Sequence, residues 1–183
     1  MENRKKEENR MAEFRLMDAT KLNRLIEAAE LERVEEEVKF LWTKKLKVSY
    51  KDNYFTFLED ETKLITFFDY SGFLLFHDLI NFLKDAHKIE IEQPEYEKYR
   101  DELIELRDEG AVIIDYYTAQ KIIPAIENLN ISKEEIFAHV PDAKATNDIQ
   151  QNTVQNQIKQ IKTFANLLKQ IKAGEVLFIR EFY

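Results

Sequence analysis

Apolar and polar residues alternate with different periods along the chain, and the first long stretch has a helical period. From about residue 18 to residue 45, apolar residues recur every three or four positions, which is typical of an amphipathic helix. Asp18 or Thr20 is suited to cap its start. A helix of roughly 27 residues would be about 40 Å long. Its stripe comprises Leu22, Leu25, Ile26, Ala29, Leu31, Val34, Val38 and Leu41.

The period then shortens to two residues. Val48 and Tyr50 alternate with polar neighbours, residues 51–53 are turn formers, and residues 54–58 are rich in strand formers. A further apolar run covers residues 64–68. These three segments predict a three-stranded antiparallel meander.

Helical and strand patterns alternate through the rest of the chain. Apolar residues occupy nearly all faces of residues 73–86, which predicts a buried helix. Pro94 suits the first turn of the next helix, which Gly110 is placed to end. Ser132 and Glu135 form a capping box. The other predicted elements are short strands at 89–92 and 111–115, a helix at 118–129 interrupted by Pro124, a long helix before Gly174, and a strand at 175–182.

This pattern predicts an α+β fold: a small, mainly antiparallel sheet packed by helices on one face, with long helices near both termini. The alternative is a three-layer α/β arrangement, which requires the strands at 64–68 and 111–115 to be parallel. Residues 1–13 mix both charges and predict a flexible or extended N-terminal arm. Residues 14–183 then form a single domain.

Composition narrows the classes of function. The chain has no cysteine, which excludes disulfides, thiolate metal sites and cysteine catalysis. Its net charge of −8 disfavours direct nucleic-acid binding. Three glycines among 183 residues are few for a phosphate-binding loop. Residues 1–13 lack a signal-peptide pattern and residues 73–76 are too short to span a bilayer, so a cytoplasmic protein with no membrane contact is expected.

Two similar segments suggest one chemical site. Leu64–Ser71 and Ala111–Thr118 are both apolar strands that end in Asp-Tyr and then a hydroxyl residue. If these strands were parallel neighbours, Asp69 and Asp115 would lie together and hold Mg²⁺ for a phosphoester enzyme. The simpler interpretation is that both aspartates are turn and cap residues.

Other catalytic or metal motifs are missing from the sequence. His77, His87 and His139 lack the ligand spacing of a metal motif, and no G-x-S-x-G is present. His77 lies inside an apolar helix and is expected to be a core residue. The sequence therefore predicts no catalytic residue, no cofactor and no metal, and a protein that is not an enzyme.

Charge is distributed unevenly between the middle and the end of the chain. Residues 90–109 carry nine acidic residues and three basic ones, whereas five lysines oppose one aspartate between residues 143 and 174. The acidic segment suggests a nucleic-acid mimic that blocks a basic groove of a partner. Its Tyr96 and Tyr99 spacing instead favours a solvated helix whose tyrosines face the core.

The hypothesis these patterns favour is a non-enzymatic interaction or assembly component, which binds a protein partner or itself through its long amphipathic helices. A structural or accessory protein of a virus or mobile element is one such role, located in the host cytoplasm or the particle. The alternatives are the acidic mimic and the Mg²⁺-dependent enzyme. The tentative interaction residues are Leu22, Ile26, Val34, Val38, Leu41, Ile158, Ile161, Leu168 and Ile171.

Overall fold

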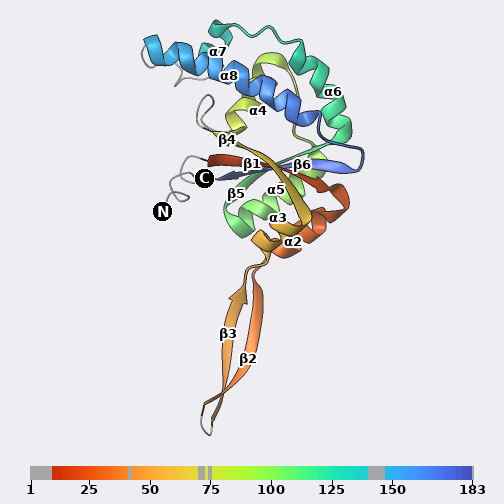
Figure 1. Cartoon of the computed structure of the whole chain (residues 1–183), viewed down its shortest axis with the longest axis vertical. Helices are drawn as coiled ribbons and strands as arrows, with labels where there is room; N and C mark the ends of the chain where they lie inside the picture. Colours follow the sequence, from red (N-terminus) through yellow and green to blue (C-terminus); the bar gives the residue numbers. More distant parts are fainter. Residues whose placement is uncertain (1–9, 41–42, 70–72, 74–75, 140–146, 183) are drawn as a thin grey trace.

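The computed structural model describes residues 10–40, 43–69, 73, 76–139 and 147–182. One four-stranded sheet has helices on both faces, and a separate two-stranded hairpin projects from the body (Figure 1). The elements are β1 Arg10–Asp18, η1 Ala19–Lys21, α2 Leu22–Ala29, β2 Glu32–Phe40, β3 Thr43–Lys51, α3 Tyr54–Glu61, β4 Thr62–Asp69, α4 Phe76–His87, α5 Pro94–Arg107, β5 Glu109–Asp115, α6 Tyr116–Glu127, α7 Lys133–His139, α8 Asn147–Leu168 and β6 Glu175–Phe182.

The main sheet is antiparallel throughout, with strand order β4-β1-β6-β5. Its middle strands come from opposite ends of the chain: β1 and β6 pair from Ala12 with Glu181 to Asp18 with Glu175. Because helices cover both faces, β5 and β6 read as nearly continuous apolar runs rather than as alternating ones. The predicted α+β class with a small antiparallel sheet is therefore confirmed.

Each face of the sheet packs against its own helical layer. Phe14, Ile114 and Leu177 face α4, α6, α7 and α8 and form the first core with them, whereas Met17 and Phe178 face α2, α3 and α5 and form the second core with them. Helices therefore lie on both faces rather than on one. The three layers of the alternative arrangement are present, but its parallel strands are not, because each paired strand runs against its neighbour.

The predicted long helix near the N-terminus is wrong. Its residues form the short α2, which ends where Glu30 becomes extended, and then the hairpin β2–β3. The stripe misled because Val34 and Val38 are four residues apart, a spacing that places them on one side of both a helix and a strand. Opposite charges across the hairpin, Glu32 facing Lys51 and Glu36 facing Lys47, favour the paired strands.

The predicted strand at residues 54–58 is also wrong, because these residues begin α3. The Asp52 carboxylate accepts a hydrogen bond from the Tyr54 backbone N–H at 3.0 Å, which supports the first turn. Tyr54, Phe57 and Leu58 are then buried together, at a helical spacing. Packing against the sheet thus overrides the strand propensity of this aromatic run.

Most later predictions are confirmed. These include α4, α5 with Pro94 in its first turn, β5, the long C-terminal helix α8, the terminal strand β6 and the Ser132–Glu135 capping box. Residues 89–92 are not a strand, although Ile89 and Ile91 are buried. Residues 10–13 of the expected arm belong to β1, and residues 1–9 lie outside the described part. Within that part, no helix has the length and apolar character needed to cross a membrane.

Candidate functional site

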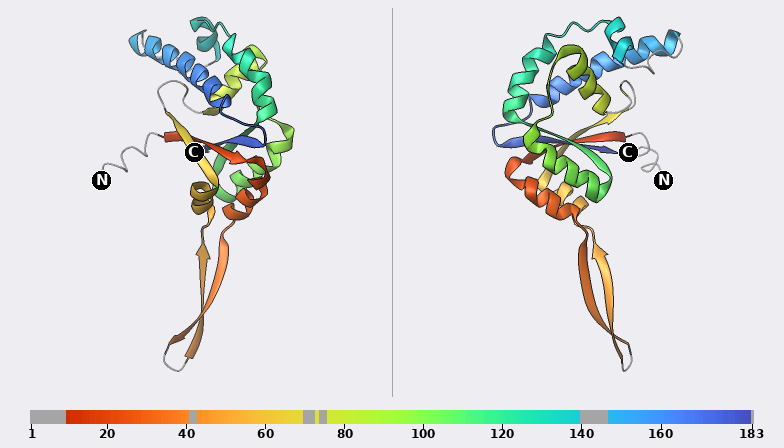
Figure 2. Two further views of the ribbon diagram at one scale, coloured as in Figure 1. Left: turned by 45° about the vertical axis from the view of Figure 1, so that its right-hand side comes forward. Right: turned by 180° about the vertical axis from the view of Figure 1, so that it is seen from behind.

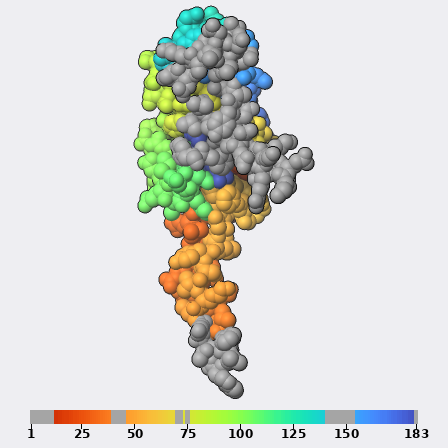
Figure 3. Space-filling view, turned by 90° about the vertical axis from the view of Figure 1, so that its left-hand side faces the viewer, coloured from red at the N-terminus to blue at the C-terminus, as the bar shows by residue number. Residues whose placement is uncertain are grey.

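The most exposed ordered feature is the hairpin Glu32–Lys51, which we call the hairpin arm. Figures 1 and 2 show it extending away from the sheet and both helical layers, and Figure 3 shows it as a narrow extension of the body. Its nine-residue strands reach about 30 Å at 3.3 Å per residue. Among the described residues, β2 and β3 pair only with each other in the sheets, so each strand keeps an unpaired edge.

One face of the hairpin arm carries an apolar row on β3 that is open to solvent and lies opposite Arg33, Glu35 and Glu37 of β2. Leu46, Val48 and Tyr50 alternate along β3, so their side chains lie on the same face, and they are 58%, 42% and 65% exposed. A two-stranded hairpin without a supporting layer is marginally stable in water. Large apolar residues concentrated on such an element are typical of a surface that another molecule covers.

The two edges of the hairpin arm carry opposite charge. Strand β2 has four glutamates against one arginine and one lysine, whereas β3 has four lysines and no acidic residue. The register places Glu32 opposite Lys51 and Glu36 opposite Lys47. These pairs stabilise the isolated hairpin and leave an acidic strand at one edge and a basic strand at the other.

The arm joins the body through a tight ionic contact. The Arg107 guanidinium, at the end of α5, donates two hydrogen bonds to the Asp52 carboxylate at 2.5 and 2.9 Å. These bonds hold the pKa of Asp52 below its usual range. The same guanidinium stacks over the Tyr54 ring at 4.7 Å. Asn53 donates a hydrogen bond to Glu32 at 2.9 Å across the foot of the arm.

A buried ion pair lies directly behind this contact. Arg180 of β6 donates two hydrogen bonds of 2.5 Å to the Glu109 carboxylate, and its guanidinium stacks over the Phe55 ring at 5.0 Å. The fully buried Tyr54 hydroxyl donates to the same carboxylate at 3.2 Å, and burial raises the pKa of Tyr54 far above its ordinary value. We call Asp52, Tyr54, Arg107, Glu109 and Arg180 the ionic base. It anchors Asp52, the residue that follows β3, to the end of α5.

The tentative interaction residues fall into two groups. All six outside the hairpin arm belong to the cores: Leu22, Ile161, Leu168 and Ile171 are buried, and Ile158 packs half-buried against the first core. Ile26 packs half-buried against the second core. These residues are therefore covered within the chain, and the expectation that they form a docking ridge is wrong. Val34 and Val38 lie on the hairpin arm, half-buried and exposed respectively, and Leu41 lies outside the described residues.

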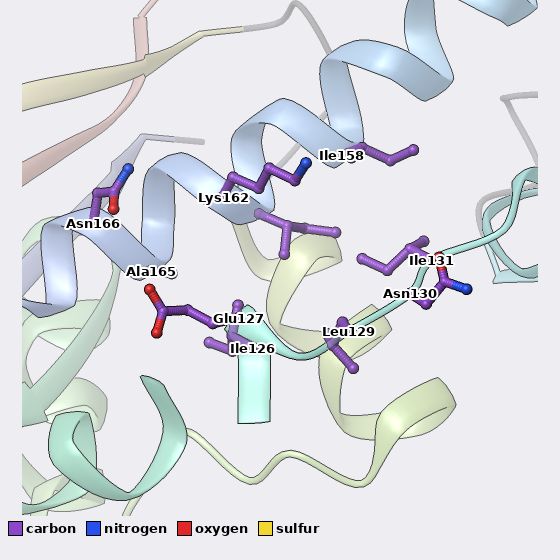
Figure 4. Close-up of a pocket in the computed structure, with 10 residues that line it drawn as sticks. Ile126, Glu127, Leu129, Asn130, Ile131, Ile158, Lys162, Ala165 and Asn166 are labelled. Atoms are coloured by element: carbon purple, nitrogen blue, oxygen red, sulfur yellow. The ribbon is translucent and has the colours of Figure 1, made fainter. Parts of the chain in front are cut away.

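A cleft of about 460 Å³ separates α8 from the segment that links α6 to α7. Figure 4 shows Leu129, Ile131 and Ile158 along its walls, with Glu127 and Lys162 beside them. Its walls combine apolar and polar side chains in similar measure, and Glu127 pairs with Lys169.

The structure separates Asp69 from Asp115. They belong to the two edge strands, about three strand spacings or 14 Å apart. Asp69 pairs with Arg10 at one end of β1, whereas Asp115 is level with Met17 near the other end, which adds roughly 20 Å along the strands. The expected shared Mg²⁺ site is therefore wrong. The Asp115 carboxylate instead accepts the Thr118 backbone N–H at 2.7 Å and caps α6.

His77 is not a simple core histidine, because it joins two carboxylates. Its Nδ1 lies 3.2 Å from the Glu181 carboxylate, which is almost fully buried, and its Nε2 lies 3.6 Å from Glu92. Arg100 pairs with the same Glu92 oxygen at 3.3 Å. The hydrogen bond to Glu181 raises the pKa of His77, against the opposing effect of burial.

The other two histidines pack around one phenylalanine. His87 and His139 meet the Phe82 ring edge-on, with centroids 5.2 and 5.8 Å away. Among the residues that the structure describes, no group of three or more His, Asp or Glu side chains is arranged to hold a metal ion.

The acidic segment divides as its tyrosine spacing predicts. Tyr96, Tyr99 and Leu103 pack against the second core. The opposite side of α5 presents four exposed carboxylates, which we call the acidic stripe: Glu97, Asp101, Glu105 and Asp108. The lysine-rich α8 packs on the other face of the sheet. The two oppositely charged helices therefore do not neutralise each other by direct contact.

Sequence reasoning missed the hairpin arm and the ionic base. A period of two across Leu46, Val48 and Tyr50, after a glutamate-rich segment and within a lysine-rich one, was the available signal for the arm. The signal for the base was a single arginine, Arg180, after the apolar run of β6.

Comparisons with known proteins add no identification, because no family model, no curated protein and no solved structure matches the chain.

Proposed function

We propose that this protein is a non-enzymatic assembly component that binds a protein partner through its hairpin arm rather than through its terminal helices. The observation that carries the proposal is the exposed face of Leu46, Val48 and Tyr50 on an element that has no supporting layer. Edge strands with free backbone groups bind other chains by strand addition. The ionic base supports the same role, because a rigid foot lowers the entropic cost of presenting the arm.

Removing the arm tests this proposal. Because Glu32 and Lys51 are paired neighbours at its foot, a short Gly-Ser link can replace Glu32–Lys51 without moving α2 from α3. The body should keep its circular dichroism spectrum, whereas self-association and capture of partners from the native source should both be lost. Equal masses and equal captured proteins for the two forms would refute the proposal.

A matched pair of point variants localises the effect. Leu46→Asp places a charge on the apolar face of the arm, and Ile104→Asp places one on an exposed apolar site of the body. Both sites are exposed, so neither change should destabilise the fold much. Only Leu46→Asp should reduce binding. Equal losses from both variants would contradict a role for the arm.

A second candidate function is an acidic inhibitor that mimics nucleic acid, and the acidic stripe favours it. Glu97, Asp101 and Glu105 recur every four residues along the solvent side of α5. Reversing these three to lysine should abolish binding to a basic partner, and added salt should weaken it. Removing the arm should leave this binding intact, which distinguishes the two candidates. Binding that resists both reversal and salt would eliminate the mimic.

A further inference from the structure

We infer that the partner covering the hairpin arm is a second copy of this chain, joined head to tail, with β2 of one copy beside β3 of the next. The inference rests on the proposed function and specifies its partner. It follows from two properties of the arm that are independent of each other: the charges of its two edges and the directions of its two strands.

Two arms can meet edge to edge in three ways, β2 with β2, β3 with β3 or β2 with β3, and the charges of the strands favour one of them. Two β2 strands would bring four glutamates of each copy together, and two β3 strands would bring four lysines of each together. Like charges on neighbouring strands repel. The remaining contact, β2 against β3, sets acidic against basic residues. Only this contact repeats the complementarity that already holds the hairpin together.

Strand direction agrees with this choice. β2 runs from the body toward the far end of the arm, and β3 runs back. If two arms lie side by side and point the same way, β2 of one is therefore antiparallel to β3 of the next. The antiparallel pattern of the hairpin continues across the contact, and the free backbone groups of both edges form hydrogen bonds.

The same arrangement places the apolar side chains of every copy on the same side of the joined sheet. Because every arm keeps its orientation, Leu46, Val48 and Tyr50 of each copy lie on one common face of the joined sheet. Each β3 gains a strand beside its exposed edge, which covers part of these side chains. A head-to-tail contact uses two different edges, so it leaves one of each free and continues into a ring or a filament.

Charge redesign of the arm tests the inference by light scattering over a range of protein concentrations. Changing the four glutamates of β2 to lysine makes both strands basic. This variant should associate at least roughly tenfold more weakly than the wild type, because like charges meet at every head-to-tail contact. The matched variant changes the four lysines of β3 to glutamate. The two variants should each be impaired alone and associate when mixed.

A full charge swap controls for folding of the arm. It combines both sets of changes: Glu32, Glu35, Glu36 and Glu37 to lysine, and Lys44, Lys45, Lys47 and Lys51 to glutamate. Opposite charges still face each other within the hairpin, as at positions 32 and 51. The swapped protein should therefore associate with itself. It should not join wild-type assemblies, because its β3 and the wild-type β2 are both acidic.

Three results would overturn the inference: a wild-type chain that stays monomeric at all concentrations, association unaffected by reversal of β2, or free mixing of swapped and wild-type chains. The proposed function fails separately. A monomeric chain whose arm still captures a different protein overturns self-assembly and supports the assembly role. A chain whose partners and mass do not change on removal of the arm overturns both.

Discussion

The ionic base makes a strong prediction about stability, because it contains a buried charge pair. Arg180 is 6% exposed and donates two hydrogen bonds to Glu109, and it also lies 3.6 Å from the Glu13 carboxylate. Arg180→Met keeps much of the side-chain volume but leaves the Glu109 carboxylate half-enclosed without its cation. Removing one partner of such a pair costs about 3–5 kcal/mol of unfolding free energy. For a chain of this length that corresponds to a fall in Tm of roughly 6–20 °C.

Urea unfolding followed by circular dichroism measures this change, at a concentration where the chain is monomeric. Arg180→Met/Glu109→Gln should be less destabilised than Arg180→Met alone, because the carboxylate that loses its bidentate partner is also neutralised and the amide still accepts from the Tyr54 hydroxyl. Lys84→Met is the matched control, since its pair with Glu90 is exposed and 3.6 Å long, and it should change stability by less than about 1 kcal/mol.

A loss below about 1 kcal/mol for Arg180→Met would refute the reasoning, because a desolvated and bidentate pair cannot be that weak when broken. Additive effects in the double variant would refute it as well. They would mean that Arg180 acts through its stacking on Phe55 rather than through the charge of Glu109.

Three further predictions follow from other parts of the chain. The raised pKa of His77 means that its pairing with Glu181 stabilises the fold fully at a pH below the pKa of His77 in the unfolded chain, and that this contribution is lost as the pH rises through its pKa in the folded protein. His77→Gln should therefore be less stable than the wild type at low pH and approach it at high pH. A stability difference that does not depend on pH would contradict this. Ile161 is buried, so Ile161→Ala should lower the free energy of unfolding in urea by about 2–5 kcal/mol. Val38 is exposed in the monomer, so Val38→Ala should lower it by at most about 0.5 kcal/mol, and equal losses would contradict the assigned burial. Because the Asp115 side chain caps α6, Asp115→Ala should lower the unfolding free energy by about 1 kcal/mol and Asp115→Asn by less, with no Mg²⁺-dependent change in Tm in either. A Mg²⁺-dependent rise in Tm of the wild type alone would contradict the capping role.

The position of the ionic base connects stability with the proposed assembly. Arg107 and Arg180 both stack on the Tyr54 ring at the foot of the arm; Arg107 pairs with Asp52, and Arg180 pairs with Glu109 and Glu13. If the arm binds a partner as proposed, variants of the ionic base should weaken that binding without altering the exposed residues of the arm.

An apolar stripe in the sequence does not show what covers it. Ile161 and Leu168 belong to a regular apolar stripe in the sequence, but such a stripe indicates only that one side of a helix is covered. It does not distinguish a partner from the chain's own sheet. The structure assigns that stripe to the first core, and it leaves the shorter apolar row of Leu46, Val48 and Tyr50 uncovered.

The sequence by itself determined the elements whose signals are local. The capping box of Ser132 and Glu135, the first-turn Pro94 of α5 and the apolar run of β5 each depend on residues within a few positions of one another. Caps, proline geometry and hydrophobic period act over that range, so they can be read without knowing the fold.

Only the tertiary structure decided the hairpin arm, the helix α3 and the strand order. The spacing of Val34 and Val38 fits both a helix and a strand, and the pairing of β2 with β3 makes this segment a strand. The order β4-β1-β6-β5 joins segments from opposite ends of the chain and separates Asp69 from Asp115. The Arg180–Glu109 pair likewise spans 71 residues. Such contacts depend on which surfaces meet in space, and the local sequence pattern around each residue does not predict them.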